Sequence, residues 1–160
     1  MNIIIDRASS RGHANHGWLN TYHTFSFANY FNPDRMQFGA LRVLNDDTVL
    51  PDEGFGTHPH KNMEVISIPL KGKLRHGDSL NNSHTITRGE IQLMSAGTGI
   101  LHSEYNDSST DNLEFLQIWV IPDRINTEPK YKDYDIKPLL KHNEICLLYT
   151  SPSPRDSTSS

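Results

Sequence analysis

The 160-residue sequence lacks the features that mark several common classes of protein. Its single cysteine, Cys146, excludes a disulfide within the chain. No hydrophobic run approaches the roughly 20 residues that a membrane helix needs. The N-terminus, M-N-I-I-I-D-R, lacks the apolar segment of a secretory signal peptide. These absences favour a cytoplasmic protein with no membrane partner.

Basic character is also scarce: 15 Lys and Arg stand against 19 Asp and Glu, and the net charge is −4. We therefore expect no direct nucleic-acid partner, because phosphate binding needs clustered positive charge. A sustained helical period is missing as well. Short runs of β-branched and aromatic residues instead alternate with turn residues, which predicts one all-β domain, a sandwich or barrel such as a jelly roll.

The expected strands cover residues 24–28, 40–45, 63–70, 72–78, 84–87, 91–94, 101–106 and 113–121. Residues 123–145 are polar and give mixed signals, so we expect a linker or a strap leaving the barrel.

The last fifteen residues, 146–160, differ abruptly in composition, with Ser, Thr and Pro dominating from Thr150. The segment Cys146–Asp156 also matches the translation of a transposon-end adapter used in short-read library preparation. We therefore expect residues 146–160 to be adapter-derived and disordered, and the natural coding sequence to continue differently after about Ile145. The alternative is a natural Ser/Pro-rich tail. On the adapter interpretation, Cys146 has no function.

Histidine is abundant in this sequence, with nine residues. Three of the nine lie in two motifs that are separated by about forty residues. In G-F-G-T-H-P-H, His58 and His60 are two residues apart, so both side chains share one face of a strand. His102 and Glu104 repeat this spacing after the turn in M-S-A-G-T-G-I-L-H-S-E-Y. If the two strands are neighbours, the four groups can bind one divalent metal and leave up to two octahedral positions open. An H-x-H pair alone is common on surfaces, so the second motif carries the prediction.

This pair of motifs resembles the two motifs of the cupin superfamily. R-G-H-A-N-H-G-W-L at 11–19, H-T-F-S-F-A-N-Y at 23–30, F-G-A-L-R-V-L-N-D-D and L-Q-I-W-V narrow the resemblance to the pirin family over residues 1–130. The resemblance implies a cupin jelly-roll barrel that forms the N-terminal half of a bicupin. It assigns residues 1–145 to that domain and its trailing linker, with the C-terminal cupin domain absent from this chain. It also implies the same ligands, His58, His60, His102 and Glu104.

The resemblance further implies a metal-dependent dioxygenase that cleaves quercetin-type flavonols with O2. Iron(II) is the expected metal, with manganese, cobalt, nickel, copper or zinc as alternatives, and Glu104 is the catalytic group that accepts the substrate proton. One alternative is that the substrate is another small enolisable molecule. A second alternative is a non-enzymatic protein that regulates a protein partner through the redox state of the metal, because the same four ligands serve both functions.

Other residues carry simpler expectations. Glu64 follows the H-x-H at a spacing that supplies a ligand in many cupins, yet in pirins the glutamate of the second motif binds, so we expect Glu64 to support the site from outside. Packing is the default expectation for Phe55 and Met94, and a substrate pocket the alternative. We expect structural hydrogen bonds from His13, His16 and His23, core positions for Trp18, Phe25 and Phe27, surface positions for His76, His84 and His142, and a solvated turn at Asp46–Asp47.

Overall fold

The computed structural model describes residues 5–140 and confirms the predicted all-β fold. The chain forms β1 (Gly12–Asn15), β2 (Leu19–His23), β3 (Leu41–Val49), β4 (Gly54–His60), β5 (Glu64–Lys71), β6 (Lys73–Asp78), β7 (Ser83–Thr87), β8 (Glu90–Ser95), β9 (Ile100–Asn106), β10 (Leu113–Val120) and β11 (Lys130–Asp135). Two short 3-10 turns, η1 (Ala8–Ser10) and η2 (Lys137–Leu139), flank them. Within residues 5–140, no helix has the length and apolar character that crossing a membrane requires.

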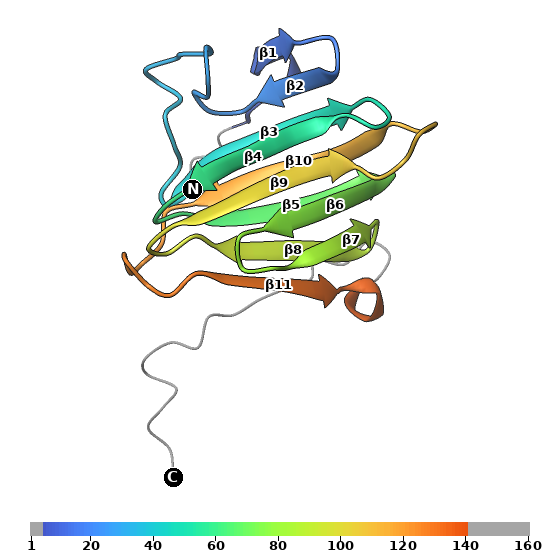
Figure 1. Ribbon diagram of the computed structural model, residues 1–160. Helices are drawn as coiled ribbons and strands as arrows, with labels where there is room; N and C mark the ends of the chain where they lie inside the picture. Colours follow the sequence, from blue (N-terminus) through green and yellow to red (C-terminus); the bar gives the residue numbers. More distant parts are fainter. Residues whose placement is uncertain (1–4, 141–160) are drawn as a thin grey trace.

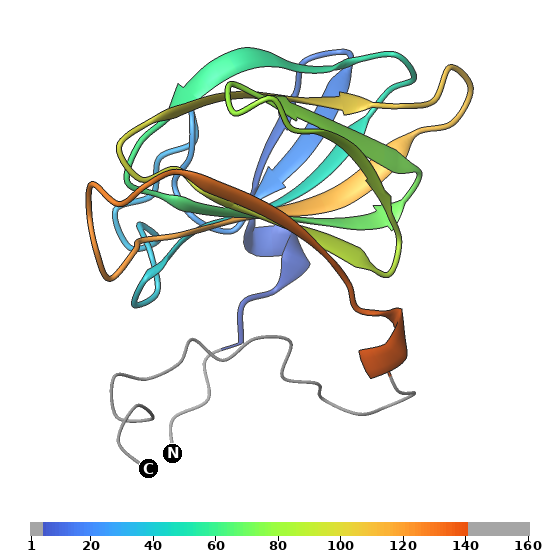
Figure 2. The same cartoon turned by 60° about the horizontal axis from the view of Figure 1, so that its bottom comes forward.

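The strands form two antiparallel sheets that face each other (Figures 1 and 2). The large sheet has seven strands in the order β1-β2-β3-β10-β5-β8-β11, and the small sheet has four in the order β4-β9-β6-β7. Strands distant in sequence are neighbours in both sheets, as β3 and β10 are in the large one. This topology brings β4 and β9, which carry the two predicted metal motifs, side by side.

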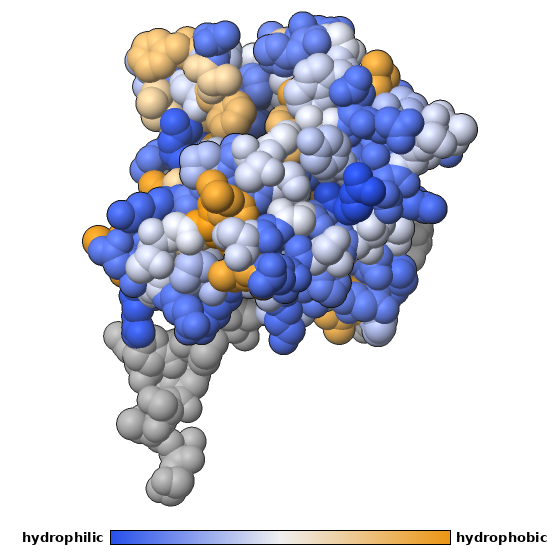
Figure 3. Space-filling view, viewed as in Figure 1, coloured by the Kyte–Doolittle hydropathy of each residue, from blue (hydrophilic) through white to orange (hydrophobic). Residues whose placement is uncertain are grey.

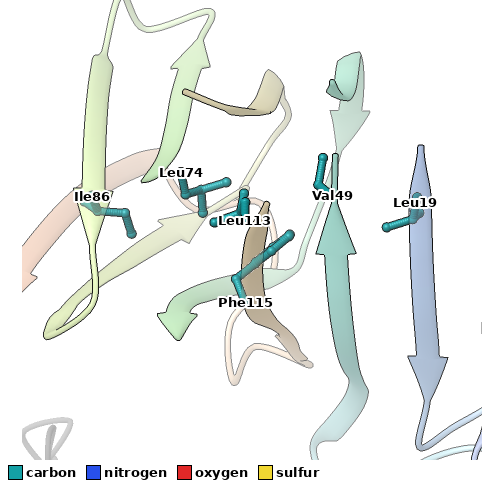
Figure 4. Packing of buried hydrophobic residues seen from close by; sticks show 6 residues of the cluster. All are labelled: Leu19, Val49, Leu74, Ile86, Leu113 and Phe115. Carbon is teal, nitrogen blue, oxygen red and sulfur yellow. The ribbon is translucent and has the colours of Figure 1, made fainter. Parts of the chain in front are cut away.

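Two apolar clusters fill part of the space between the sheets. One comprises Leu19, Val49, Leu74, Ile86, Leu113 and Phe115, whose side chains turn toward one another in Figure 4. The other comprises Val65, Met94, Ala96 and Ile100. Full burial of each large side chain stabilises the fold by about 1.5–3 kcal/mol. The strand register places the two clusters toward opposite ends of β10, with Leu113 at one end and Trp119 at the other.

Between the two clusters, the inner face of the large sheet is polar. Directly paired positions on five neighbouring strands carry His23, Asn45, Gln117, Ser67 and Gln92. All five side chains are buried, and we call them the polar row. Because buried polar groups need hydrogen-bond partners, these side chains must bond one another or polar groups on the opposite sheet.

Seven of the eight expected strands coincide with observed strands to within a few residues. The strand expected at 24–28 is wrong. β2 ends at His23, Ala28 adopts a φ of +48°, and a single bridge joins Phe27 to Tyr30. The turn expected at Asp46–Asp47 is also wrong, because β3 continues through both residues to Val49.

The linker expected after residue 123 is wrong for 130–135, which form β11 and pair with β8. β11 is an edge strand of mixed polar residues, so it lacks the apolar alternation that identifies a strand covered on one face. The expectations for the tail 146–160 and for His142 lie outside the described residues.

An exposed apolar patch lies on the connection between β2 and β3. Phe31 and Phe38 have 72% and 73% of their surface exposed, and Met36 has 38%. Figure 3 shows hydrophobic side chains at the upper left, where this connection lies in Figure 1. Patches of this kind promote association in water.

Candidate metal centre

The two motifs predicted to share a metal are adjacent in the small sheet. His58 on β4 lies directly opposite His102 on β9, and a β-bulge between Phe55 and His58 sets this register. One ring nitrogen from each of His58, His60 and His102 lies within 4.8 Å of the others. The structure therefore brings together the three imidazoles that the spacing predicted.

The hydrogen bonds of His58 define which of its nitrogens is free. Its Nδ1 lies 2.7 Å from the carbonyl oxygen of Gly56, which can only accept, so Nδ1 carries the proton. The lone pair on Nε2 then points at Nε2 of His102, 3.0 Å away. Two nitrogens bound to one ion at ~2.05 Å would lie roughly 2.9–3.4 Å apart in octahedral or tetrahedral geometry. The observed separation therefore suits two ligands of one divalent metal.

Burial keeps the imidazoles of His60 and His102 neutral at pH 7. It lowers the pKa of His60 to about 4, with a smaller contribution from neighbouring His58. Burial, together with the nearby imidazoles of His58, His60 and His76, lowers the pKa of His102 to about 2. Since only a neutral imidazole can bind a metal, His60 and His102 are ready to act as ligands at pH 7.

Glu104 lies on the same strand as His102 and is buried, but it is not among the three side chains whose ligand atoms cluster. Its carboxylate instead accepts hydrogen bonds from Ser67, Gln92 and Gln117. Burial raises the pKa of Glu104, and the bonds from Ser67 and Gln117 act in the opposite direction. The carboxylate lines the same cavity as His58 and His60, so it faces the site where the imidazoles meet.

The cavity has a volume of about 390 Å³, within the usual range for small-molecule sites. Its walls are largely aromatic, from Trp18, Phe27, Phe55 and Trp119. The ring of Trp119 lies 4.8 Å from that of His60, edge to face. A planar aromatic molecule could therefore pack between these walls with one end beside the three histidines.

The remaining histidine predictions have mixed outcomes. His23 donates to Asn45 at 2.9 Å, and His13 bonds Asn20 at 2.7 Å, as expected for structural roles. His16 lines the cavity. His84 is exposed, as expected. The surface position expected for His76 is wrong.

His76 has no exposed surface, and its Nε2 lies 2.8 Å from a carboxylate oxygen of Asp78. The alternation of β6, in which Leu74 and His76 share the buried face, explains this position. Glu64 accepts a hydrogen bond from Ser95 and does not join the histidine group.

The aromatic predictions fit better. Phe25 is buried, and Trp18 packs against the first apolar cluster, while Phe27 is half-buried and lines the cavity. Met94 is a core residue, as expected by default, whereas Phe55 both packs on the core and lines the cavity.

Sequence reasoning missed the polar partners of the site, chiefly Ser67, Gln92, Gln117 and Asp47. The available signal was a polar residue in the buried phase of an otherwise apolar strand, as in E-V-I-S-I-P-L-K of β5. Such residues are hydrogen-bonded when buried, so they indicate a polar group on the opposite sheet.

Comparison with known proteins agrees with this geometry. A family model described as Pirin matches residues 5–120. The chain is 54% identical over 130 residues to a quercetin 2,3-dioxygenase of Escherichia coli K12, covering 81% of this chain and 56% of that protein. It is 52% identical over 120 residues to a putative quercetin 2,3-dioxygenase of Zymomonas mobilis, covering 75% and 51%.

Among solved structures, the bacterial pirin YhhW from E. coli in complex with nickel(II) is 53% identical, with a TM-score of 0.80 over 81% of this chain and 56% of that one. The chain thus spans about half the length of the curated relatives it matches. The three clustered histidines and this nickel complex support a divalent metal at the site. The predicted cupin fold and resemblance are confirmed, and this chain belongs to the pirin family.

Proposed function

We propose that His58, His60, His102 and Glu104 bind one divalent metal, and that the protein uses it to cleave a quercetin-type flavonol with O2. The observation that carries the proposal is the 3.0 Å approach of two imidazole nitrogens at the wall of an aromatic cavity. The names of the relatives from E. coli and Z. mobilis support this substrate. Iron(II) is the proposed metal, and manganese, cobalt, nickel, copper and zinc are alternatives.

The cavity walls would hold the flavonol. Trp18 and Phe55 meet edge to face at 5.1 Å, and Phe27 and Trp119 do so at 5.4 Å. These rings present apolar faces to a planar substrate and exclude water from the reacting end. The bound metal would stabilise the deprotonated 3-hydroxyl group of the substrate.

Glu104 is the proposed acceptor of that hydroxyl proton, which it takes when its oxygen leaves the metal. Its burial raises its pKa, which increases its affinity for a proton. Ser67 and Gln117 keep the carboxylate at the cavity wall through hydrogen bonds of 2.6 Å each. The proton therefore moves a short distance to a group whose position the opposite sheet holds.

An assay of the iron(II)-loaded chain with quercetin, with and without O2, tests the proposal. We expect oxygen-dependent loss of quercetin, at least 100-fold slower in Glu104→Gln, as for loss of a general base. Glu64→Gln is the matched control, since Glu64 lies outside the histidine group, and it should retain activity. Metal binding without any quercetin consumption would exclude the dioxygenase and favour the regulatory alternative.

The open cavity is the observation that favours an enzyme over a regulator, because a purely regulatory metal site needs no space for a substrate. The cytoplasmic location and the absence of a direct nucleic-acid partner stay predictions.

A further inference from the structure

The carboxylate of Glu104 is held unequally at its two oxygens. Oε1 accepts from the hydroxyl of Ser67 at 2.6 Å and from the amide of Gln92 at 3.4 Å. Among the residues that the structure describes, Oε2 accepts only from the amide of Gln117, at 2.6 Å. A carboxylate oxygen has two lone pairs in its plane. Both are therefore engaged at Oε1, whereas Oε2 keeps one free.

The hydroxyl group of Ser67 has two neighbouring acceptors, and the distances show to which one it donates its proton. The Ser67 oxygen lies 2.6 Å from Glu104 Oε1 and 3.2 Å from the amide oxygen of Gln117. A hydroxyl has a single proton, and a bond to a carboxylate is stronger than one to a neutral amide. Ser67 therefore donates to Oε1 and is the main contact that restrains this oxygen.

The amide of Gln92 is oriented by its own partners. Its nitrogen lies 3.0 Å from Nδ1 of His76, and its oxygen lies 3.5 Å from the hydroxyl of Tyr131. His76 Nε2 bonds the carboxylate of Asp78, so Nε2 carries the proton and Nδ1 accepts. These contacts orient the Gln92 amide nitrogen toward Oε1 of Glu104. Gln92 is therefore a second donor to this oxygen, at a longer distance than Ser67.

The hydrogen-bond partner of the less restrained oxygen lies on the side of the cavity. Gln117, the partner of Oε2, lines the cavity together with Glu104, His58 and His60, whereas Ser67 and Gln92 do not. Both latter residues have no exposed surface. The two donors to Oε1 thus lie behind the carboxylate, and the one donor to Oε2 lies beside the site of the histidines.

We propose that Ser67 and Gln92 are positioning residues that limit Glu104 to one-oxygen binding, through Oε2, at the metal centre. This inference rests on the proposed role of Glu104 as a ligand. By holding Oε1 back, the two donors prevent a second bond from the same carboxylate. They thereby preserve a coordination position for the substrate or O2.

The test is X-ray absorption of the nickel(II)-loaded chain, which counts the light-atom neighbours of the metal, together with calorimetric titration of nickel(II). In Ser67→Ala, Oε1 loses its short bond and becomes free to bind, so we expect one additional oxygen neighbour and unchanged or tighter nickel binding. Ser95→Ala is the matched control, because Ser95 is also a strand serine that donates to a glutamate, but its acceptor is Glu64 and not Glu104. Its spectrum should equal that of the wild type.

Gln92→Leu removes the longer bond and should shift the coordination number in the same direction, by less. A Ser67→Ala protein that binds nickel(II) with the wild-type number of neighbours overturns the inference. So does a Ser67→Ala protein that loses nickel(II) while Ser95→Ala keeps it, since Ser67 would then control binding itself and not the number of oxygens. Failure of the wild type to bind nickel(II), or identical spectra for wild type and Glu104→Gln, would instead reject the ligand set under Proposed function.

Discussion

Asp47 is an acid in an environment that opposes its charge. Only 3% of its surface is exposed, and its Oδ1 has no hydrogen-bond partner within residues 5–140. Its pKa is raised to about 7, chiefly by burial and also by the nearby carboxylates of Glu104 and Asp46, although a hydrogen bond from Thr21 acts in the opposite direction. The folded protein therefore holds a proton on Asp47 at pH values where the unfolded chain has released it.

This linkage makes stability fall as pH rises. Below the ordinary Asp pKa both states bind the proton, and the cost is absent. Between about pH 4 and pH 7 the unfolded state gains from ionisation and the folded state does not, so the free energy of unfolding decreases. Asp47→Asn cannot ionise, so we expect it to exceed the wild type by a few kcal/mol at about pH 8, with the difference vanishing near pH 4.

Urea denaturation of the metal-free protein across this pH range measures the effect. Asp46→Asn is the matched control, because the Asp46 carboxylate is half-buried and lies 3.1 Å from Arg11. It removes one of the two carboxylates that raise the pKa of Asp47, so its gain with rising pH should be much smaller than that of Asp47→Asn. A constant difference between Asp47→Asn and the wild type at all pH values would contradict the assignment.

At the scale of elements, the metal centre depends on how closely β4 approaches β9. A Cβ atom on Gly54 would lie 2.6 Å from the Cα of Tyr105 and closer still to the carbonyl oxygen of Glu104. Both are backbone atoms and cannot rotate away. On Gly56, the nearest atom would be the Tyr105 hydroxyl at 3.7 Å, an ordinary contact.

We therefore expect Gly54→Ala to force the two strands apart. The free energy of unfolding should fall by about 1–3 kcal/mol, and nickel(II) affinity should fall because His58 and His60 move away from His102. Gly56→Ala, the matched control, should change both by little. Urea denaturation and nickel titration of the two variants provide the measurement, and equal effects would show that strand separation does not control the site.

The elements also show what could be predicted from sequence. Short runs of β-branched and aromatic residues between turn residues located seven strands, and the spacing of His58, His60 and His102 predicted their convergence, because both signals are local in the sequence. The polar row gave only a weaker signal, a polar residue such as Ser67 in the buried phase of an apolar strand, which does not reveal that Glu104 and His76 face Ser67 and Gln92 from the other sheet. That pairing is a property of the tertiary fold, and one sequence does not contain it.

The predictions of a turn at Asp46–Asp47 and of a linker over the residues of β11 were wrong for a related reason. Asn-Asp-Asp is typical of turns, yet the pairing of Asp47 with Phe115 on β10 and Thr21 on β2 keeps the segment extended. The edge strand β11 is stabilised by β8 and by the stacking of Tyr131 on His76, at a centroid distance of 4.2 Å. Both are contacts between residues far apart in the sequence.

At the scale of the whole molecule, the candidate metal centre lies between the two sheets and contacts both of them. The three histidines belong to β4 and β9 of the small sheet, whereas Ser67 and Gln117, which bond Glu104, belong to β5 and β10 of the large one. A metal bound to Glu104 would connect both sheets through this carboxylate. Local opening of the sandwich at this level would break the metal site, so metal binding and global stability should be coupled.

That coupling predicts a stability gain whose size is set by mass action. At a free nickel(II) concentration of 100 times Kd, the free energy of unfolding should rise by about 2.7 kcal/mol, seen as a higher Tm that a chelator reverses. His102→Ala removes a ligand and should abolish the gain. His84→Ala, on an exposed histidine outside the group, should retain it. If both variants kept the gain, nickel(II) would be stabilising the protein at another site, because the loss of an imidazole at the junction of the sheets must reduce binding there.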